Sequence, residues 1–266
     1  MRWRLSARIL TAVVAAVLLS GCGGKKQARV SPPPPPPMVA PPAAPAPSPS
    51  ASKGAAAAPP VAADKKQEKA DEIARELSVP EGTKPLSVEI GNASWYGAPY
   101  HNRRGSNGEL YDMNQLTAAH RTLPLGSTVR VTNLKTGHST IVRITDRGPF
   151  VEGRIIDLSL AAAKQADVWQ AGVAKVRLEV LRTPVPSAYG GRWAVQIGSF
   201  PDEADARTVA SQVSRRYKTA RVLSFGSPVG DWWVRVRVLQ DDRKRAEEVA
   251  RDTRTSEGKI FLVRLD

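Results

Sequence analysis

One stretch decides the fold of the middle of this 266-residue chain: TVRVTNLKTGHSTIVRITDRGPF, residues 128–150. Polar and apolar residues alternate over 128–131 and again over 140–144, which is the pattern of strands that bury one face. Lys135-Thr136-Gly137 lies between the two runs and ends in a glycine suited to a turn. The stretch therefore predicts a β-hairpin that leads into the turn-like segment TDRGP, residues 145–149.

Short strands flank this hairpin. Residues 93–96 and 174–181 have the composition of strands, and His120 ends a further Leu-Thr-Ala-Ala strand. One clear helix begins with Ser159 as its N-cap and continues through an alanine-rich segment. Residues 88–183 are therefore expected to form a small, mostly β domain.

A second domain is expected over residues 190–266. Trp193, Val195 and Ile197 alternate with smaller or polar residues, as in a strand, and Pro201 and Asp202 then suit the start of a helix. Strands are further predicted at 220–225, 232–239 and 259–265, and a second helix at 242–253. The order βαββαβ predicts a ferredoxin-like α+β fold, with four antiparallel strands and two helices on one face.

The N-terminus predicts secretion. Three arginines precede an apolar run over residues 9–19, which is too short to span a bilayer and has the layout of a signal peptide, residues 1–21. Leu19-Ser20-Gly21-Cys22 resembles the lipobox of bacterial lipoproteins, which predicts lipidation of Cys22; the alternative is a free thiol beside an ordinary cleavage site. Because Cys22 is the only cysteine, no disulfide within the chain is expected.

Residues 22–87 are rich in Pro, Ala, Ser and Lys and are predicted to be a disordered tether, with a transient helix over 64–77. The formal charge of +14 indicates an acidic partner. Secretion argues against nucleic acid and leaves an anionic membrane or wall polymer.

Three motifs carry a resemblance to a known family: "ASWYG" at 93–97, "GELYDMNQLTAAHRTLPLG" at 108–126 and "VRITDRGPF" at 142–150. Here the chain resembles the rare lipoprotein A (RlpA) family of septal lytic transglycosylases, which implies a six-stranded double-psi β-barrel. The segment "VQIGSF" at 195–200 is similar to SPOR domains, which bind glycan strands stripped of their stem peptides. Lipobox, tether, barrel and SPOR domain stand in the order of that family.

The resemblance implies the site residues of the barrel. Asp146 matches the family's proposed acid, and Glu109 and His120 match its supporting catalytic residues; Asp112 and Tyr96 are the expected substrate-binding residues. A lytic transglycosylase uses the C6 hydroxyl of muramic acid as its nucleophile, so one carboxyl group can serve as both acid and base. No cofactor or metal is expected.

Each of these residues also has a structural interpretation. Asp146 suits a turn, because an Asp side chain bonds the backbone two residues on. Glu109 follows a glycine and fits a solvated loop residue. His120 fits a hydrogen-bonded structural histidine, and Asp112 fits a turn cap. The residues alone leave both interpretations open.

In the C-terminal domain, alternation separates the two faces of the strand at 232–238. The valines at 234, 236 and 238 and Trp232 are expected under the helices, and the open face receives the other residues. A tryptophan beside amide and guanidinium groups suits a sugar ring. The expected glycan-binding residues are Gln196, Ser199, Phe200, Trp233 and Arg235; the alternative is an ordinary exposed sheet face.

The sequence thus predicts an endolytic transglycosylase that cleaves peptide-free peptidoglycan strands and leaves 1,6-anhydro-muramic acid ends. Gly23 stands where an inner-membrane retention signal has Asp, so we expect a lipid anchor in the periplasmic face of the outer membrane, with enrichment at the division septum. The alternatives are an expansin-like protein that binds polysaccharide without cutting it and a division-site adaptor.

Overall fold

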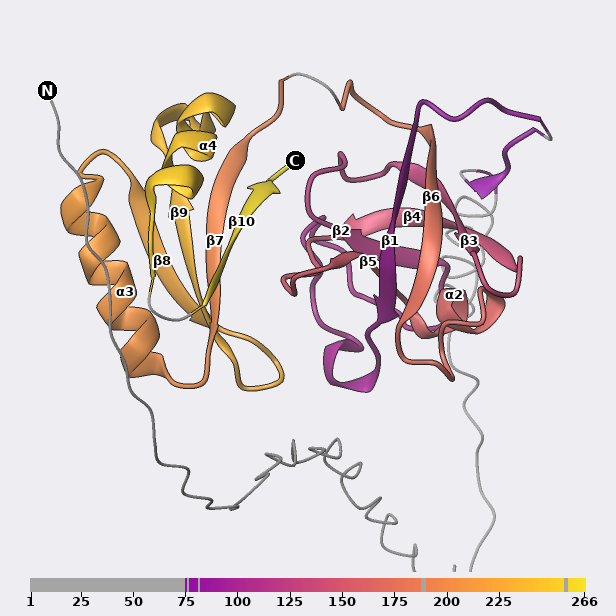
Figure 1. The fold of residues 1–266 in the computed structure, drawn as a ribbon, viewed down its shortest axis with the longest axis horizontal. Helices are drawn as coiled ribbons and strands as arrows, with labels where there is room; N and C mark the ends of the chain where they lie inside the picture. The colour runs from indigo at the N-terminus through magenta and orange to yellow at the C-terminus, as the bar shows by residue number, and fades with distance from the viewer. Residues whose placement is uncertain (1–74, 76, 81, 188–189, 256–257) are drawn as a thin grey trace, which may run out of the picture. The chain divides into compact units, whose positions relative to one another are not determined.

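The computed structural model describes residues 75, 77–80, 82–187, 190–255 and 258–266. The signal peptide, Cys22 and most of the tether and of the helix expected at 64–77 lie outside the described residues. Figure 1 shows a β-barrel domain and a sheet domain with two helices, and each is described by itself. No helix in the described part combines the length and the apolar character that a bilayer crossing requires.

The first domain is the six-stranded closed barrel that the sequence predicts. Around the barrel, the strands follow the order β1-β5-β2-β4-β3-β6. The pairs β1/β5 and β2/β4 are parallel, and the other neighbours are antiparallel. The strands are β1 Ser87–Trp95, β2 Thr117–His120, β3 Thr128–Asn133, β4 Ser139–Asp146, β5 Arg154–Leu158 and β6 Ala174–Arg182.

The predicted hairpin is confirmed as β3 and β4, in which Val129 lies opposite Val142. The predicted helix is confirmed as α2, Leu160–Gln165, and the Ser159 hydroxyl accepts a hydrogen bond from Ala162 N at 3.2 Å. The strands predicted from alternating residues do not include β5. Two adjacent isoleucines break the alternating pattern of this short strand.

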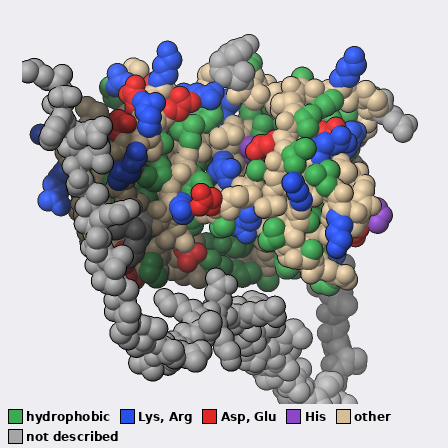
Figure 2. All heavy atoms as spheres, in the orientation of Figure 1, with side chains coloured by type: hydrophobic (Ala, Val, Ile, Leu, Met, Phe, Trp, Pro, Cys, Tyr) green, Lys and Arg blue, Asp and Glu red, His purple; other side chains and the backbone are tan. Residues whose placement is uncertain are grey.

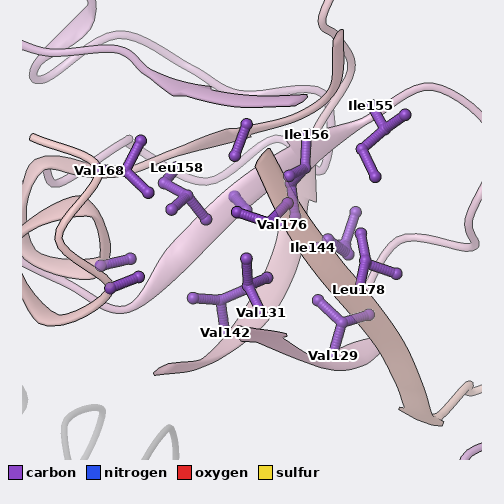
Figure 3. Packing of buried hydrophobic residues seen from close by; sticks show 14 of the residues in the cluster. Val129, Val131, Val142, Ile144, Ile155, Ile156, Leu158, Val168, Val176 and Leu178 are labelled. Carbon is purple, nitrogen blue, oxygen red and sulfur yellow. The ribbon is translucent and has the colours of Figure 1, made fainter. Parts of the chain in front are cut away.

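Apolar side chains fill the interior of the barrel. Figure 3 shows valine, isoleucine and leucine side chains from several strands turned toward one another. Val129, Val142 and Ile144 are fully buried. Large-to-small substitutions at such sites cost about 2–5 kcal/mol in stability. This core therefore holds in place the strands that carry the site residues.

The second domain has the predicted βαββαβ order. Its sheet order is β10-β7-β9-β8, all antiparallel, and α3 and α4 lie on one face of the sheet (Figure 1). The ferredoxin-like prediction is therefore confirmed. The elements are β7 Trp193–Phe200, α3 Glu203–Arg216, β8 Arg221–Gly226, β9 Trp232–Arg237, α4 Arg243–Asp252 and β10 Lys259–Arg264.

The predicted faces of β9 are also confirmed on the helix side. Val234 and Val236 are fully buried in the core that α3 and α4 cover, and Trp232 packs against the same core. Asp202 caps α3 by accepting a hydrogen bond from Asp205 N at 3.0 Å. The chain therefore begins this helix where the sequence predicts.

Candidate active site

Three residues lie side by side across the rim of the barrel. Ala119 of β2 pairs with Asp146 of β4 on one side and with Asp157 of β5 on the other. Residues that pair across strands share a face of the sheet, and neighbouring strands lie ~4.8 Å apart, so the two aspartate Cα atoms are about 10 Å apart. Ala119, which is itself buried, therefore lies between the two aspartates.

A glycine in the next turn supports this arrangement. A Cβ added at Gly148 would lie 3.6 Å from Ala119 Cβ and 3.8 Å from Asp157 Oδ2. The turn that follows Asp146 therefore reaches the carboxyl group of Asp157. Asp146, Ala119 and Asp157 are among the residues that line one hollow.

Asp146 is held by three donors on one oxygen. Its Oδ1 accepts hydrogen bonds from Ser106 N at 2.9 Å, from Ser106 Oγ at 2.5 Å and from Arg147 N at 2.7 Å. Such a donor set suits a carboxylate, which only accepts hydrogen bonds. A Cβ at Gly105 would lie 3.3 Å from Thr145 O, so the close approach of this loop favours glycine.

Glu109 ties the same loop to β4. Its Oε2 accepts hydrogen bonds from Arg143 Nη2 at 2.8 Å and from Asn107 Nδ2 at 2.9 Å. Asn107 N in turn donates to Thr145 O at 3.2 Å. Glu109 therefore holds the loop that carries Ser106, and it does not line the hollow at Ala119.

His120 lies on the opposite face from Ala119 and is 6% exposed. Its Nδ1 accepts hydrogen bonds from Thr122 N at 3.2 Å and Leu123 N at 3.0 Å, and its Nε2 lies 3.7 Å from Glu89 Oε2. Burial lowers the pKa of His120, although Glu89 partly offsets this effect. The structure thus places His120 in a turn as a hydrogen-bond acceptor, without bringing it to Asp146.

Arg147 connects the His120 turn to Asp146. Its Nη1 donates to His120 O at 3.0 Å and to Leu123 O at 2.7 Å. Burial lowers the pKa of Arg147 to about 10. Because Arg147 N also bonds the Asp146 carboxylate, the His120 turn and the Glu109 loop position that carboxylate from two sides.

The two expected substrate-binding residues have different surroundings. Asp112 caps a turn, since its Oδ1 accepts from Asn114 N at 2.9 Å, and it does not line the hollow. Tyr96 lines the hollow and stacks on Tyr111 with ring centroids 4.3 Å apart. Tyr100 meets Tyr96 edge-on at 5.8 Å. An aromatic wall therefore stands beside the two aspartates.

The sequence did not predict Asp157 as a site residue. Its side chain is 16% exposed, accepts a hydrogen bond from Ser94 Oγ and lies 3.6 Å from Arg154 Nη2. Burial raises the pKa of Asp157, although Arg154, Ser94 and Arg121 lower it. The available signal was an acidic residue in the middle of an apolar strand, Ile155-Ile156-Asp157-Leu158.

The helix-free face of the second domain is less open than expected. Gln196 and Trp233 are 2% and 8% exposed. Arg235 covers Gln196 by donating to its Oε1 at 2.6 and 3.1 Å, and its guanidinium lies 5.1 Å from the centre of the Phe225 ring. The Trp233 ring occupies the space above Gly198, where an added Cβ would meet it at 2.6 Å.

Phe200 does not lie on this face. It is 1% exposed and belongs to the core under the helices, whereas Ser199 is exposed. The pairing of β7 with β9 shifts between Gly198 and Phe200, and this irregularity reverses the alternation. The structure therefore places Phe200 in the core and not on the face that was predicted to bind glycan.

Comparisons with known families agree with the two domains. Residues 88–178 match a family described as lytic transglycolase, and residues 189–259 match the SPOR domain. Within the described residues, no group of three or more His, Cys, Asp or Glu side chains is arranged to hold a metal ion.

Curated relatives that carry one common name are similar to this chain in sequence. The endolytic peptidoglycan transglycosylase RlpA of Vibrio cholerae is 57% identical over 100 residues, 38% of this chain and 38% of the relative. That of Campylobacter jejuni is 42% identical over 169 residues, 53% of this chain and 60% of the relative. The chain therefore spans less than two thirds of either relative.

A solved structure, an expansin of Clavibacter michiganensis in complex with cellohexaose, is 14% identical. The match covers 57% of this chain and 81% of the expansin with a TM-score of 0.31. A likeness this low carries no argument about function.

Proposed function

This chain belongs to the RlpA family, and on that premise we propose that it is an endolytic peptidoglycan transglycosylase. The observation that carries the proposal is the Asp146 carboxylate, which three donors fix at the wall of the hollow that it lines with Ala119 and Asp157. A group that transfers protons must keep one orientation toward the reacting atoms, and this hydrogen-bond set provides it.

The proposed reaction needs no external nucleophile. The C6 hydroxyl of a muramic acid residue attacks C1 of the same residue, the glycosidic bond to the next sugar breaks, and a 1,6-anhydro end forms. Because the nucleophile belongs to the bound sugar, effective molarities of ~10⁵ M or more are within reach. Asp146 is the proposed proton-transfer residue at this centre.

We propose positioning roles for Glu109 and His120. Glu109 holds the loop that presents Ser106, and His120 shapes the turn that binds Arg147. Both residues act on the reaction through Asp146. Asp112 is proposed to act at a greater remove, by capping the turn that precedes β2.

Charge supports a preference for strands without stem peptides. Arg103, Arg104 and Arg154 line the hollow with Asp146. A muramic acid without its stem peptide exposes a lactyl carboxylate, which arginine donors can bind, whereas a stem peptide converts that group into a neutral amide. Basic side chains are also spread over the face of the molecule in Figure 2, in line with an acidic polymer as substrate.

The second domain is proposed to bind the glycan and to direct the protein to the division septum. Gln196, Trp233 and Arg235 supply amide, aromatic and guanidinium groups on the helix-free face, and exposed Ser199 lies at the end of β7. Sugars combine an apolar ring face with hydroxyl groups, so this combination suits them.

Anchoring is proposed at the N-terminus. After removal of residues 1–21, lipidated Cys22 would hold the protein at the periplasmic face of the outer membrane, and residues 22–87 would let the two domains reach the wall.

The test is digestion of purified glycan strands with and without stem peptides, followed by mass analysis of the ends. We expect new 1,6-anhydro ends, with faster cleavage of the peptide-free strands. New reducing-end muramic acid would indicate a hydrolase, and binding without new ends would favour the expansin-like alternative.

A further inference from the structure

We propose that Asp157 is the general acid of the reaction, which protonates the oxygen of the departing sugar, while the Asp146 carboxylate takes the proton of the C6 hydroxyl. This inference rests on the proposed function and divides its two proton transfers between two residues. It replaces the expectation that a single carboxyl group serves both.

The placement of the two residues supports a shared substrate. Asp146 and Asp157 flank Ala119 on one face, and both line the same hollow. The two side chains extend from strands that are two spacings of ~4.8 Å apart, so both can reach one sugar bound in this hollow.

The surroundings of the two carboxyl groups differ. Asp146 receives three hydrogen bonds on one oxygen, two of them from backbone N–H groups, which suits an anion. Asp157 lies in a strand between two buried residues, Ile156 and Leu158, and burial raises its pKa. Pairs of titratable groups with opposed environments are characteristic of an acid and a base.

The charged groups that face Asp157 leave this assignment intact. Arg154 Nη2 lies 3.6 Å from Asp157 Oδ2. The positive charge of Arg121, in the segment after β2, also lowers the pKa of Asp157. Both favour the ionised form, as does the hydrogen bond from Ser94. Burial outweighs these effects, so the pKa of Asp157 remains raised.

A groove beside Asp157 offers a place for the departing sugar. Its volume is about 460 Å³, and Trp95, Tyr96 and Tyr100 form its aromatic lining, with Asp157 and Arg154 also in its wall. Aromatic rings suit the apolar face of a sugar. The departing strand would then lie in this groove, with its oxygen toward Asp157 and the muramic acid toward Asp146.

The proposed step balances as follows. The proton of the Asp157 carboxyl moves to the glycosidic oxygen as the C1–O bond breaks and its electron pair stays on that oxygen. The C6 oxygen forms a bond to C1 and loses its proton to the Asp146 carboxylate. The products are a 1,6-anhydro end and a free 4-hydroxyl on the departing strand, and proton exchange with water restores both residues.

The test compares Asp157→Asn and Asp146→Asn, in the full chain, on two substrates. One substrate is a peptide-free glycan strand; the other is a GlcNAc–MurNAc disaccharide with a nitrophenolate leaving group at C1, which departs without a proton. We expect Asp157→Asn to lose ~10²–10⁴-fold in kcat on strands and to stay within about tenfold of the wild type on the disaccharide. Asp146→Asn should lose activity on both substrates.

The pH profile and a matched control complete the test. With Asp157 as the acid, wild-type kcat/KM on strands falls as pH rises through the pKa of that carboxyl, and this limb is absent from Asp157→Asn. Glu179→Gln changes another acidic barrel residue, 8% exposed, and should leave both activities unchanged. Thermal unfolding of each variant verifies its fold.

Near wild-type cleavage of strands by folded Asp157→Asn would overturn the proposal. Equal losses on both substrates would also overturn it, because they would make Asp157 a structural residue. Wild-type protein that forms no anhydro ends would instead contradict the proposed function, so the two failures are distinguishable.

Discussion

The barrel and the C-terminal sheet hold their polar groups in different ways. In the barrel, Asp146 is fixed by two backbone N–H groups and a hydroxyl from its own turn and a neighbouring loop. On the sheet, Gln196 and Arg235 bond to each other across β7 and β9. A carboxylate held by the backbone keeps one orientation, as proton transfer requires, whereas a side-chain pair can exchange its partner for a ligand hydroxyl. The first arrangement suits chemistry and the second suits binding.

The largest expected effect is on the barrel side of this comparison. Asp146→Asn preserves size but removes the proton acceptor, so we expect kcat on peptide-free strands to fall ~10²–10⁴-fold. Mass analysis of new anhydro ends measures the loss. Binding of the same strands should be retained, because the sheet is unchanged. A folded Asp146→Asn protein with wild-type activity would remove Asp146 from the reacting centre.

Substitutions on the sheet should weaken glycan binding without slowing the cleavage step itself. Arg235→Ala removes the guanidinium that bonds Gln196, and we expect affinity for peptide-free strands to fall about tenfold or more, as for loss of a charged hydrogen bond. Trp233→Ala should also weaken binding and leave the fold intact, while Trp232→Ala should mainly destabilise it.

Sedimentation of the uncleaving Asp146→Asn protein with glycan measures this affinity. Charge pairing is screened over ~8 Å at physiological ionic strength, so binding through stacking and hydrogen bonds should depend only weakly on salt. Binding abolished by moderate salt, or equal in the two sheet variants and their parent, would remove the helix-free face as the glycan site.

A smaller effect is expected for the residues that position Asp146. His120→Ala removes an acceptor for two backbone N–H groups, at a cost of about 1–3 kcal/mol in stability. We expect kcat to fall with little change in KM, and His120→Asn, whose amide oxygen can replace Nδ1, to restore most of both. Chemical denaturation and steady-state rates measure the two quantities. Equal activity losses in the Ala and Asn variants would indicate that the imidazole itself takes part in the reaction.

A still smaller effect is expected in how the free energy of unfolding depends on pH. Burial lowers the pKa of His120 in the folded state, while the unfolded value is ~6.5. Below that value the unfolded chain binds a proton that folded His120 does not, so the free energy of unfolding decreases as pH falls from about 7 to 5, by at most ~1.4 kcal/mol per pH unit. The pKa of Glu89 is lowered from 4.5, so its contribution is lost only at lower pH. As pH falls from about 7 to 5, the denaturation midpoint of the wild type should therefore decrease relative to that of His120→Asn.

Local patterns predicted much of the fold and less of the site. Ser159 as a helix cap and the alternating faces of β9 depend on neighbouring residues, and both predictions are confirmed. The buried position of Phe200 was not predicted, because a register shift reverses the alternation and no local pattern marks that shift. The pairing of Ala119 with both aspartates depends on strands far apart in the chain. For the same reason Asp157 was missed, and the turn that His120 shares with Arg147 was not foreseen.

The most direct test of the central claim is cleavage of peptide-free strands in ¹⁸O-labelled water, followed by mass analysis of the new muramic acid ends. We expect 1,6-anhydro ends without label, because the attacking oxygen comes from the sugar itself. Ends that carry one ¹⁸O atom at C1 would show that water is the nucleophile and would contradict the proposed transglycosylase reaction.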